Sequence, residues 1–545
     1  MNKTADITRP ADLKSHDLGT GPTRTHRPVY QDFLPPCNHA CPAGENIQAW
    51  LALVQAGHYQ QAWQQIMRDN PLPAVHGRVC YHPCETSCNR EQFDGAVSIH
   101  AVERFLGDMA ITENWQITPD FPASGKRVLV VGAGPSGLSA AYHLARLGHQ
   151  VVIYEAGPIA GGMLRFGIPA YRLPRQELDF EIQRIVSLGV EIVLNRKVDN
   201  VLAEKQAGMF DAVFVAVGAH LSKRIDIPAR DASKMLDAIA FLRETSAGNA
   251  PKLGRKVAIY GGGNTAMDAA RTAKRLGAEP YIIYRRDRDH MPAHSFEADE
   301  AIEEGVKINW LRSIKNMDET SLTVEVMALD ANGVAQPTGT YETLEADALI
   351  LAVGQDTDTS FLRAVPGIEF KSDGTVIVDS SMRTGAEGIF AGGDMVPSER
   401  TVTAGVGHGK KAAKHIDAWL KSSRYVSAPK HEPVGFEQLH VWYQTDAEQK
   451  QQAHIPVAER TESFSEIVAG LTARDATFEA QRCFSCGNCF ECDGCYGACP
   501  EKAIIKLGPG NRYRYDYALC TGCAVCFEQC PCHAIAMVAE ERDHP

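Results

Sequence analysis

The cysteines near the C-terminus repeat one spacing twice, and each copy reads C-x2-C-x2-C-x3-C-P. In paired [4Fe-4S] clusters with this spacing, three thiolates of one copy bind one cube and the fourth binds the other. The expected ligands of one cluster are Cys489, Cys492, Cys495 and Cys530. Those of the other are Cys520, Cys523, Cys526 and Cys499. A zinc site is the alternative, but zinc sites usually pair two C-x2-C knuckles and need no C-x3-C-P tail.

A module of this kind carries electrons and has no chemistry of its own on an organic substrate. Three further thiols lie close to it in the sequence, namely Cys483, Cys486 and Cys532. We interpret them as packing or shielding groups around the clusters.

Composition favours a cytoplasmic redox enzyme. The chain has 545 residues, of which 44% are hydrophobic, so three or four domains are expected. No apolar run is long enough to span a membrane, and the polar start Met1–Pro10 lacks the apolar core of a secretory signal. Sixteen cysteines in a reducing compartment indicate metal ligands, and the net charge of −12 argues against a nucleic-acid partner.

The cysteines are confined to the two ends of the chain. Five lie between Cys37 and Cys88, eleven lie between Cys483 and Cys532, and residues 89–482 contain none. A flavin disulfide reductase needs a redox-active cysteine pair beside its flavin, and this middle segment has none. No catalytic nucleophile stands out, so we expect the middle segment to hold organic cofactors.

A first dinucleotide-binding motif starts at Lys126. An apolar strand leads into G-x-G-x-x-G, formed by Gly132, Gly134 and Gly137, and then into a predicted helix. The next apolar strand ends at Glu155. The glycines let a pyrophosphate approach the helix start, and the carboxylate accepts hydrogen bonds from a ribose.

A second motif of the same kind starts at Lys256 and contains Gly261, Gly263 and Ala266. Its following strand ends in Arg285 and Arg286, where the first motif has its acid. Guanidinium groups suit a 2′-phosphate, so NADPH is preferred over NADH; two solvated arginines in a loop are the alternative. Two dinucleotide motifs without a substrate-pocket motif indicate one flavin and one nicotinamide.

At this point the chain resembles a known family. From about residue 24 to about residue 423 it is similar to the small (beta) subunit of bacterial glutamate synthase and to the flavin half of dihydropyrimidine dehydrogenase. The segments that carry the resemblance are Gly161–Pro169, Asp211–Gly218, Tyr284-Arg-Arg with the later Met291-Pro-Ala, and Gly388–Asp394. The C-terminal segment resembles the small iron-sulfur subunit of 2-oxoacid:ferredoxin oxidoreductases, and glutamate synthase small subunits ordinarily lack it.

The resemblance implies that the first motif, with Gly162, holds FAD and that the second holds NADPH. It also implies that Asp394 contacts the ribityl or pyrophosphate part of FAD and that Thr403 lies near the flavin ring. A helix start there suits an anionic reduced flavin. From the residues alone, Asp394 could equally cap a helix.

The resemblance further implies [4Fe-4S] chemistry in the N-terminal segment. Related proteins hold two clusters there and use an additional C-x2-C before the position of Cys37, but Gln31–Pro36 occupies that place in this chain. We therefore expect one cluster, bound by Cys41, Cys80, Cys84 and, on a following helix, Glu103. Alternatively, Cys37 or Cys88 completes it; otherwise these two are remnants of a lost cluster.

The expected fold is multidomain α/β: an N-terminal α-helical iron-sulfur domain, two Rossmann-like domains and a bacterial-ferredoxin-like α+β domain. The expected domain limits are 1–115 for the helical domain, 124–250 and 354–423 for the FAD domain, 251–353 for the NAD(P)H domain, 424–480 for a connector and 481–545 for the ferredoxin domain.

The function predicted from these parts is electron transfer between NADPH and a protein partner, through FAD and [4Fe-4S] clusters. The expected partner is a 2-oxoacid oxidoreductase or a ferredoxin, and neither a nucleic acid nor a membrane is expected. The alternative is a glutamate synthase small subunit that supplies electrons to a large amidotransferase subunit. A scaffold without nucleotide exchange would require damaged glycine motifs, and both motifs are intact.

Overall fold

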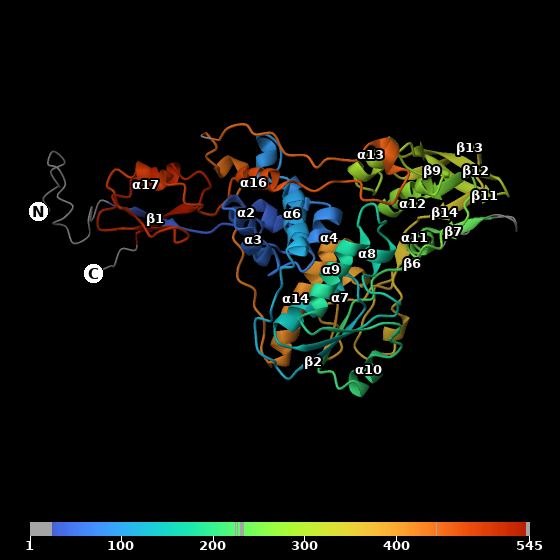
Figure 1. The fold of residues 1–545 in the computed structure, drawn as a ribbon, viewed down its shortest axis with the longest axis horizontal. Helices are drawn as coiled ribbons and strands as arrows, with labels where there is room; N and C mark the ends of the chain where they lie inside the picture. Colours follow the sequence, from blue (N-terminus) through green and yellow to red (C-terminus); the bar gives the residue numbers. More distant parts are fainter. Residues whose placement is uncertain (1–23, 224, 226, 229–233, 443, 541–545) are drawn as a thin grey trace, which may run out of the picture.

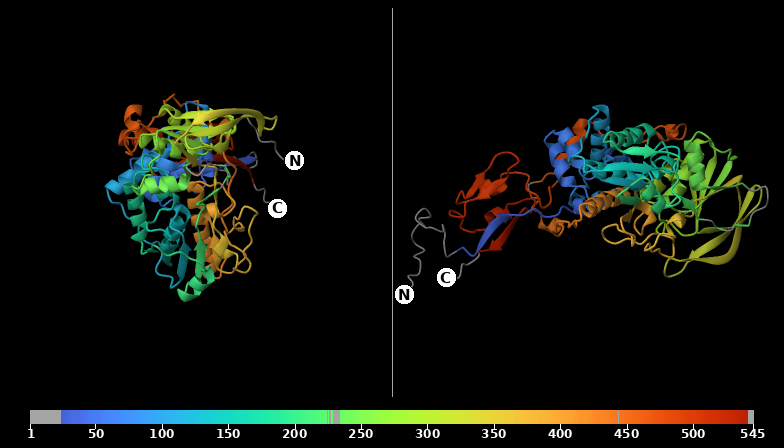
Figure 2. Two further views of the ribbon diagram at one scale, coloured as in Figure 1. Left: turned by 90° about the vertical axis from the view of Figure 1, so that its right-hand side faces the viewer. Right: turned by 90° about the horizontal axis from the view of Figure 1, so that it is seen from below.

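The computed structural model describes residues 24–223, 225, 227–228, 234–442 and 444–540, so the polar start Met1–Pro10 lies outside the described residues. The chain is elongated, with the C-terminal cysteine module at one end and the second dinucleotide domain at the other (Figure 1). The N-terminal helices and the first dinucleotide domain lie between them. Figure 2 shows that the module also stands apart from the main body in a turned view.

The N-terminal domain is a small helical bundle around the buried side chains of Trp50 and Trp63. Its longest helix, α6, is amphipathic and turns an apolar stripe toward the core. The helices are α1 (Pro36–Ala40), α2 (Ile47–Gln55), α3 (Tyr59–Ile66), α4 (Pro73–Val79), α5 (Pro83–Thr86), the 3-10 turn η2 (Asn89–Gln92) and α6 (Ile99–Thr112). Helices α4 and α6 approach each other closely at Gly77, where an added Cβ would lie only 2.4 Å from Cβ of Arg104.

The first dinucleotide domain is built on a five-stranded parallel sheet of order β16-β5-β2-β3-β4. The strands are β2 (Arg127–Val131), β3 (Gln150–Tyr154), β4 (Glu191–Val193), β5 (Ala212–Val215) and β16 (Ile389–Ala391). The central strands read as continuous apolar runs because both faces of a parallel sheet are covered. The helical elements are α7 (Pro135–Arg146), α8 (Met163–Phe166), α9 (Arg175–Val186), α10 (Val201–Ala207), η3 (Ser360–Leu362), η4 (Gly393–Met395) and α14 (Val402–Leu420).

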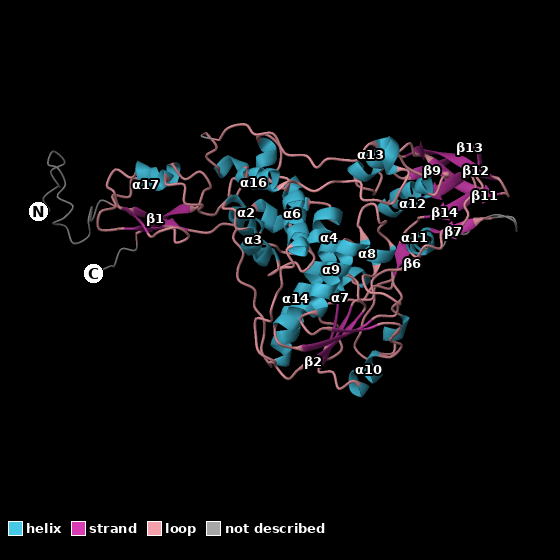
Figure 3. Cartoon of the chain, in the orientation of Figure 1, coloured by secondary structure: helices cyan, strands magenta, loops and turns pink. Residues whose placement is uncertain are grey.

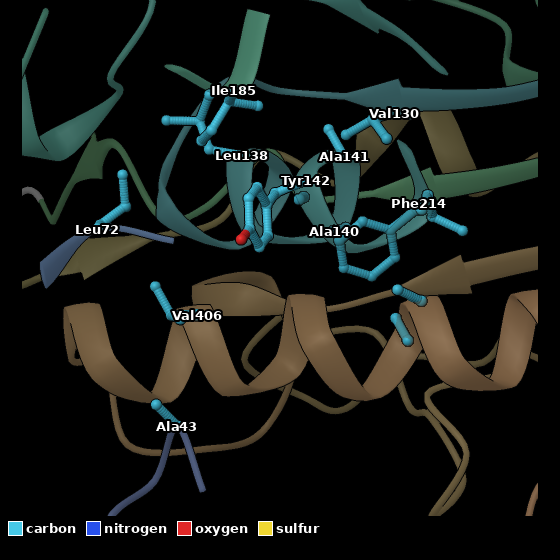
Figure 4. Packing of buried hydrophobic residues seen from close by; sticks show 14 of the residues in the cluster. Ala43, Leu72, Val130, Leu138, Ala140, Ala141, Tyr142, Ile185, Phe214 and Val406 are labelled. Carbon is cyan, nitrogen blue, oxygen red and sulfur yellow. The ribbon is translucent and has the colours of Figure 1, made fainter. Parts of the chain in front are cut away.

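Helices α7 and α14 pack together against this sheet. Figure 4 shows Ala140 and Tyr142 of α7 near Phe214 of the sheet and Val406 of α14. All four side chains are fully buried, and the Tyr142 hydroxyl donates to the Met67 carbonyl at 2.7 Å. The core of the first dinucleotide domain therefore continues into the N-terminal helical domain.

The second dinucleotide domain has a parallel sheet of order β10-β9-β8-β14-β7 with an antiparallel β11-β12-β13 meander beside it (Figure 3). The strands are β7 (Met235–Asp237), β8 (Lys256–Tyr260), β9 (Glu279–Tyr284), β10 (Lys307–Trp310), β11 (Arg312–Met317), β12 (Ser321–Leu329), β13 (Ala335–Glu345) and β14 (Ala348–Leu351). Its helices are α11 (Ala238–Ser246), α12 (Asn264–Arg275) and α13 (Ser295–Glu303). The chain passes between the two dinucleotide domains twice. A short antiparallel pair, β6 (Leu221–Ser222) with β15 (Gln355–Asp356), links these two connecting segments.

The C-terminal part returns along the N-terminal helices before it forms the ferredoxin module. The returning segment contains η5 (Phe436–Gln438), α15 (Val457–Arg460) and α16 (Ala473–Gln481). The module contains α17 (Gly494–Ala498), β17 (Ile504–Lys506), β18 (Tyr513–Tyr515), α18 (Val525–Glu528) and β19 (Ile535–Ala539).

The two ends of the chain meet in this module. Strand β1 (His26–Tyr30) pairs antiparallel with β19 over five residues. The ring of Tyr30 stacks on Tyr515 at 4.8 Å between centroids. Thus the first described strand, although far away in sequence, completes a sheet of the C-terminal module.

The multidomain α/β class predicted from the sequence is confirmed, with two Rossmann-like sheets between an N-terminal helical domain and a C-terminal cysteine module. Within the described part of the chain, no helix combines the length and the apolar character that crossing a bilayer requires.

Candidate functional site

The glycines of the first motif occupy three different environments. Gly132 adopts φ +103°, and a Cβ there would lie 2.5 Å from the Ala216 carbonyl. A Cβ at Gly137 would lie 1.9 Å from the Gly132 carbonyl, whereas Gly134 faces open space. These environments match a tight turn, a close helix-strand contact and an open approach for a pyrophosphate.

A cavity of about 770 Å³ lies in front of this turn. Its walls include Gly134, Glu155, Gly162 and Asp394, all expected at the FAD site. The Glu155 carboxylate already accepts from the backbone amides of Ala133 at 2.8 Å and of Gly157 at 2.7 Å. These contacts hold the carboxylate at the cavity wall, where a ribose hydroxyl could donate to it.

Asp394 lies in η4, and its neighbour Gly393 packs against Ser136 at the start of α7. Burial raises the pKa of the Asp394 carboxyl to about 6, and nearby Arg400 partly opposes that rise. Helix α14 begins beside it, and the Thr401 hydroxyl caps this helix by accepting from the Ala404 amide at 3.1 Å. Thr401 and Val402 also line the cavity, so the positive end of the helix dipole faces it.

The second motif faces the same cavity from the other dinucleotide domain. Gly261 has φ +152° and lies against Ala352, while Gly263 faces open space. Ala266 is fully buried in α12. The next residues of this turn and helix, Asn264, Thr265 and Asp268, line the cavity. Ligands on the two motifs would therefore share one cavity.

The two arginines after β9 differ in their surroundings. Arg285 is exposed. Arg286 is half-buried, and its Nε donates to the Tyr284 hydroxyl at 2.9 Å. Both follow the carboxyl end of a strand next to the Gly261 turn, which is where an adenosine ribose lies in this fold.

Thr403 connects the cavity region to the N-terminal cysteines. Its hydroxyl donates to Sγ of Cys80 at 3.1 Å. The neighbours of Cys80 in sequence, Val79 and Tyr81, both line the cavity. Tyr81 was not anticipated from the sequence, and its hydroxyl accepts from Nδ2 of Asn264 at 2.6 Å. The segment that forms one wall of the cavity therefore also carries Cys80.

Cys41, Cys80 and Cys84 lie together behind this wall, and we call this group, with Glu103, the Cys41 site. Burial raises the pKa of Cys41, and the negative charges of Glu45, Glu103 and Cys80 raise it further. Burial raises the pKa of Cys84 as well, with contributions from Cys80 and Cys41. A bound metal cluster would replace the protons of these thiols.

Two buried carboxylates, Glu103 and Glu45, lie beside these three cysteines, although the sequence indicated only the first. Asn70 Nδ2 donates to Glu103 Oε1 at 2.7 Å and to Glu45 Oε1 at 3.1 Å. Burial and the charge of Glu45 raise the pKa of Glu103 well above its usual range. No pattern marked Glu45 in the sequence, because its proximity to Glu103 arises only when α6 packs against the loop after Cys41.

The remaining N-terminal cysteines have unexpected neighbours. Cys37 and Cys88 line one small cavity together with Cys483 and Cys486, and we call these four the joint cysteine site. The last two were expected to pack around the ferredoxin clusters; instead, the segment after α16 brings them to the N-terminal helices. The sequence did contain a signal, because Cys483 and Cys486 have C-x2-C spacing.

The C-terminal cysteines lie in two groups in the structure. After burial, the charge of Cys530 is among the causes that raise the pKa of Cys489, Cys492 and Cys495. The second set lines one small cavity: Cys499, Cys520, Cys523 and Cys526. Cys532 lies beside Cys530, with their sulfurs 3.8 Å apart.

The spacing of the sulfurs does not suit a single zinc ion. Among the described residues, two groups of three possible metal ligands have all their ligand atoms within 4.8 Å of one another, and neither includes a cysteine. They are His82, Glu85 and His100, and Glu45, His76 and Glu103. Four thiolates on one zinc ion would be closer together than this limit, whereas a cube holds its thiolates further apart.

Comparisons with known proteins agree with this organisation. The family described as pyridine nucleotide-disulphide oxidoreductase matches residues 126–409, and dihydropyrimidine dehydrogenase domain II, 4Fe-4S cluster, matches residues 30–115.

Three curated relatives are similar over most of their length. The NADP(+)-dependent formate dehydrogenase subunit beta of Moorella thermoacetica is 36% identical over 84% of this chain and 71% of its own. The NADPH-Fe(3+) oxidoreductase subunit beta of Geobacter sulfurreducens is 35% identical over 85% of this chain and 77% of its own. The glutamate synthase [NADPH] small chain of Escherichia coli K12 is 32% identical over 71% of this chain and 89% of its own.

The matches confirm the family resemblance predicted from the glycine and cysteine motifs. The chain belongs to the pyridine nucleotide-disulphide oxidoreductase family, in the group that carries an N-terminal 4Fe-4S domain and includes the glutamate synthase small chain, and it is an NAD(P)H-dependent flavin and iron-sulfur oxidoreductase.

Proposed function

We propose that this chain is the electron-transfer subunit of a larger complex, in which it passes electrons between NADPH and a protein partner. The observation that carries the proposal is the wall shared by the main cavity and the Cys41 site. Thr403 contacts Cys80 from the helix whose first residues line the cavity. This contact supports a direct electron path between the cavity and the N-terminal cysteines.

The residues present fit FAD and NADPH. Gly134 and Gly263 leave room for two pyrophosphates, and Glu155 offers a carboxylate to a ribose. FAD, when bound, exchanges a hydride with a nicotinamide and single electrons with iron-sulfur clusters. The protein contributes position and electrostatics: the α14 N-terminus favours negative charge, and the Arg172–Asp268 ion pair, with a 2.8 Å N–O distance, ties the two dinucleotide domains together.

The cluster ligands are part of this proposal. Each set in the C-terminal module combines three cysteines of one copy with the last cysteine of the other. We assign Cys41, Cys80, Cys84 and Glu103 to the N-terminal cluster, and the buried position of Glu103 supports its role. The domain limits given above, 1–115 through 481–545, are proposed as well.

Coenzyme preference follows from Arg285 and Arg286. A 2′-phosphate near the end of β9 would pair with guanidinium groups, so NADPH binds more tightly than NADH. In the double variant Arg285→Ala with Arg286→Ala, we expect the preference for NADPH to fall by one to two orders of magnitude, roughly the value of one charge-assisted hydrogen bond. Anaerobic bleaching of the flavin absorbance, titrated with each nucleotide, measures this.

The control for this experiment is Lys307→Ala, an exposed residue at the start of the neighbouring strand β10. It should leave the preference unchanged. If NADH bleaches the wild-type flavin at least as readily as NADPH, the assignment of the two arginines is wrong.

The partner is proposed to be a 2-oxoacid oxidoreductase or a ferredoxin, and the location cytoplasmic. The relatives from Moorella and Geobacter are named as subunits, which supports a protein partner. The exposed position of the ferredoxin module at one end of the molecule supports a contact there (Figure 1). None of the sixteen cysteines is joined to another in a disulfide, as suits a reducing compartment.

The second candidate is a glutamate synthase small subunit, which the similarity to the Escherichia coli protein favours. Affinity purification of the full chain from its source cells, followed by mass spectrometry, separates the two. We expect a thiamine-diphosphate-dependent 2-oxoacid oxidoreductase or a ferredoxin to co-purify. A large glutamine-dependent synthase would support the second candidate and overturn the first.

A further inference from the structure

We infer that the joint cysteine site, made of Cys37, Cys88, Cys483 and Cys486, holds a second N-terminal [4Fe-4S] cluster whose C-x2-C pair comes from the C-terminal part of the chain. The inference extends the proposed function, which has one N-terminal cluster. It gives a role to four thiols that would otherwise be remnants or packing groups.

The four cysteines come from three segments that converge on one small cavity. Cys37 lies in α1, Cys88 precedes η2, and the other two lie in the loop after α16. All four line this cavity, and none forms a disulfide. Cys37 lies close enough to the other three thiols for their charges to act on it. Four thiols gathered in this way match the ligand set of a cube.

The rest of the cavity suits a cluster better than water. Leu51, Val97, Ile99 and Phe484 contribute apolar walls. The sulfurs are also too widely spaced for one zinc ion: among the described residues, no group of three close ligand atoms includes a cysteine. An apolar shell with dispersed thiols is the environment in which iron-sulfur clusters are protected from solvent.

Hydrogen-bond donors already point at two of the sulfurs. Asn89 Nδ2 donates to Sγ of Cys486 at 3.4 Å, and the Ser485 amide donates to Sγ of Cys483 at 3.4 Å. Gln48 Nε2 in turn donates to the Ser485 hydroxyl at 2.6 Å across the interface between α2 and this loop. Such donors stabilise thiolate charge on a cluster and adjust its potential.

Charged side chains fix the loop in this position. The buried guanidinium of Arg482, next to Cys483, donates to the Ala96 carbonyl at 2.7 Å and pairs with Glu479 at 2.9 Å. It also pairs with Asp94 at 3.1 Å, and Arg90 donates to the Arg482 carbonyl. Arg90 lines the cavity, where its positive charge would offset the negative charge of a thiolate-bound cube.

The location places this cluster between the others. Cys37 and Cys41 lie one helical turn apart at α1, and Cys84 and Cys88 stand in the same relation at α5, so each pair gives one cysteine to each N-terminal site. On the other side, Cys486 is followed after two residues by Cys489 of the ferredoxin module. The Gly487 amide donates to the Cys532 carbonyl at 2.6 Å, and this hydrogen bond connects the joint cysteine site to the module. Electrons from the Cys41 site would therefore reach the module through this cluster, with no proton transfer or bond change.

The test compares the full-length wild type with Cys483→Ala/Cys486→Ala after anaerobic reconstitution with iron and sulfide. We expect about sixteen irons per chain in the wild type and about twelve in the variant, since each cube holds four. Electron paramagnetic resonance of dithionite-reduced protein should lose one cluster's signal and keep those of the module. Cys532→Ala, which removes a thiol outside all the assigned sets, is the matched control and should retain about sixteen irons.

The single variant Cys37→Ala removes a ligand from a different segment and should lose the same signal, which guards against an effect of local unfolding after α16. The inference is overturned if the wild type holds only about twelve irons or if the double variant keeps the wild-type iron content and spectrum.

The same samples separate this inference from the proposed function. NADPH should still bleach the flavin of the double variant, while its electron delivery to an acceptor at the module should fall at least tenfold. A wild type with about sixteen irons whose flavin does not respond to NADPH would contradict the proposed function and leave the cluster inference standing.

Discussion

The ferredoxin module and the N-terminal cysteine sites use the same side chain in opposite ways. In the module, the proposed ligands all lie between Cys489 and Cys530, and short loops bring them together. In the N-terminal region, α1, α5 and a loop from the other end of the chain each supply cysteines. The first kind of site depends on local spacing, whereas the second depends on the docking of distant segments.

The largest effect should come from breaking that docking. In Arg482→Ala, Glu479 loses its buried partner, Asp94 keeps only Arg90 as an ionic partner, and several carbonyls lose a donor. Removing one side of a buried ion pair costs about 3–5 kcal/mol, so the urea midpoint of the main body should fall markedly. Unfolding followed by flavin release measures this, and iron analysis should show loss from the joint cysteine site with the module intact.

Arg474→Ala, on the exposed side of the same helix, is the control and should behave as wild type. If Arg482→Ala has the same urea midpoint and iron content as Arg474→Ala, the joint cysteine site does not depend on the buried ion pairs of Arg482.

A smaller, pH-dependent effect should come from Glu181, which holds the start of α4, the helix that leads to Cys80. Its carboxylate accepts from the Ala74 amide at 2.9 Å and the Val75 amide at 3.0 Å. Burial raises its pKa from 4.5 to about 7, although Arg184 and these amides oppose the rise. Because the folded pKa is the higher one, the stabilisation is complete below pH 4.5 and is lost as the pH rises through 7.

The free energy of unfolding of the main body should therefore fall by about 3 kcal/mol between pH 4.5 and 7.5, on the basis of 1.36 kcal/mol per pKa unit. Glu181→Gln should flatten that slope, whereas Glu191→Gln, at the exposed start of β4, should retain it. Urea unfolding at a series of pH values provides the measurement. A Glu181→Gln protein with the wild-type slope would contradict this assignment.

The smallest effect should come from removing one hydroxyl from each region. The Thr403 hydroxyl contacts Cys80 of the N-terminal site at 3.1 Å, and the Tyr30 hydroxyl contacts Cys495 of the module at 3.2 Å. A donor to sulfur stabilises the reduced cluster, so its removal lowers the potential. We expect Thr403→Val to lower the reduction potential of the cluster at the Cys41 site by about 40 mV, and Tyr30→Phe to lower that of one module cluster by the same amount. This value assumes that each hydrogen bond contributes about 1 kcal/mol and that a one-electron potential changes by about 59 mV for each tenfold change in the equilibrium constant.

Redox titration followed by electron paramagnetic resonance assigns each shift. Each variant serves as the control for the other, since Thr403→Val should leave the module unchanged and Tyr30→Phe should leave the Cys41 site unchanged. Equal shifts in both regions would show that the substitutions act on the protein as a whole rather than on single sulfurs.

Much of the fold follows from local patterns in the sequence. The turns at Gly132 and Gly261 need backbone conformations that glycine allows, and the apolar strands before them can only be buried, so both dinucleotide domains were predictable. The pairing of β1 with β19 was not, because a five-residue strand that contains Pro28 does not specify its partner.

The sites divide in the same way. The sequence alone determined the two glycine motifs and the repeated cysteine spacing from which the crossed ligand sets are proposed, because each is encoded within a few dozen neighbouring residues. Only the tertiary structure decided that Glu45 lies beside Glu103, that Thr403 supports Cys80 and that Cys483 and Cys486 meet Cys37 and Cys88. These contacts depend on how buried surfaces and ion pairs dock segments that lie from dozens to hundreds of residues apart, and no local spacing records that.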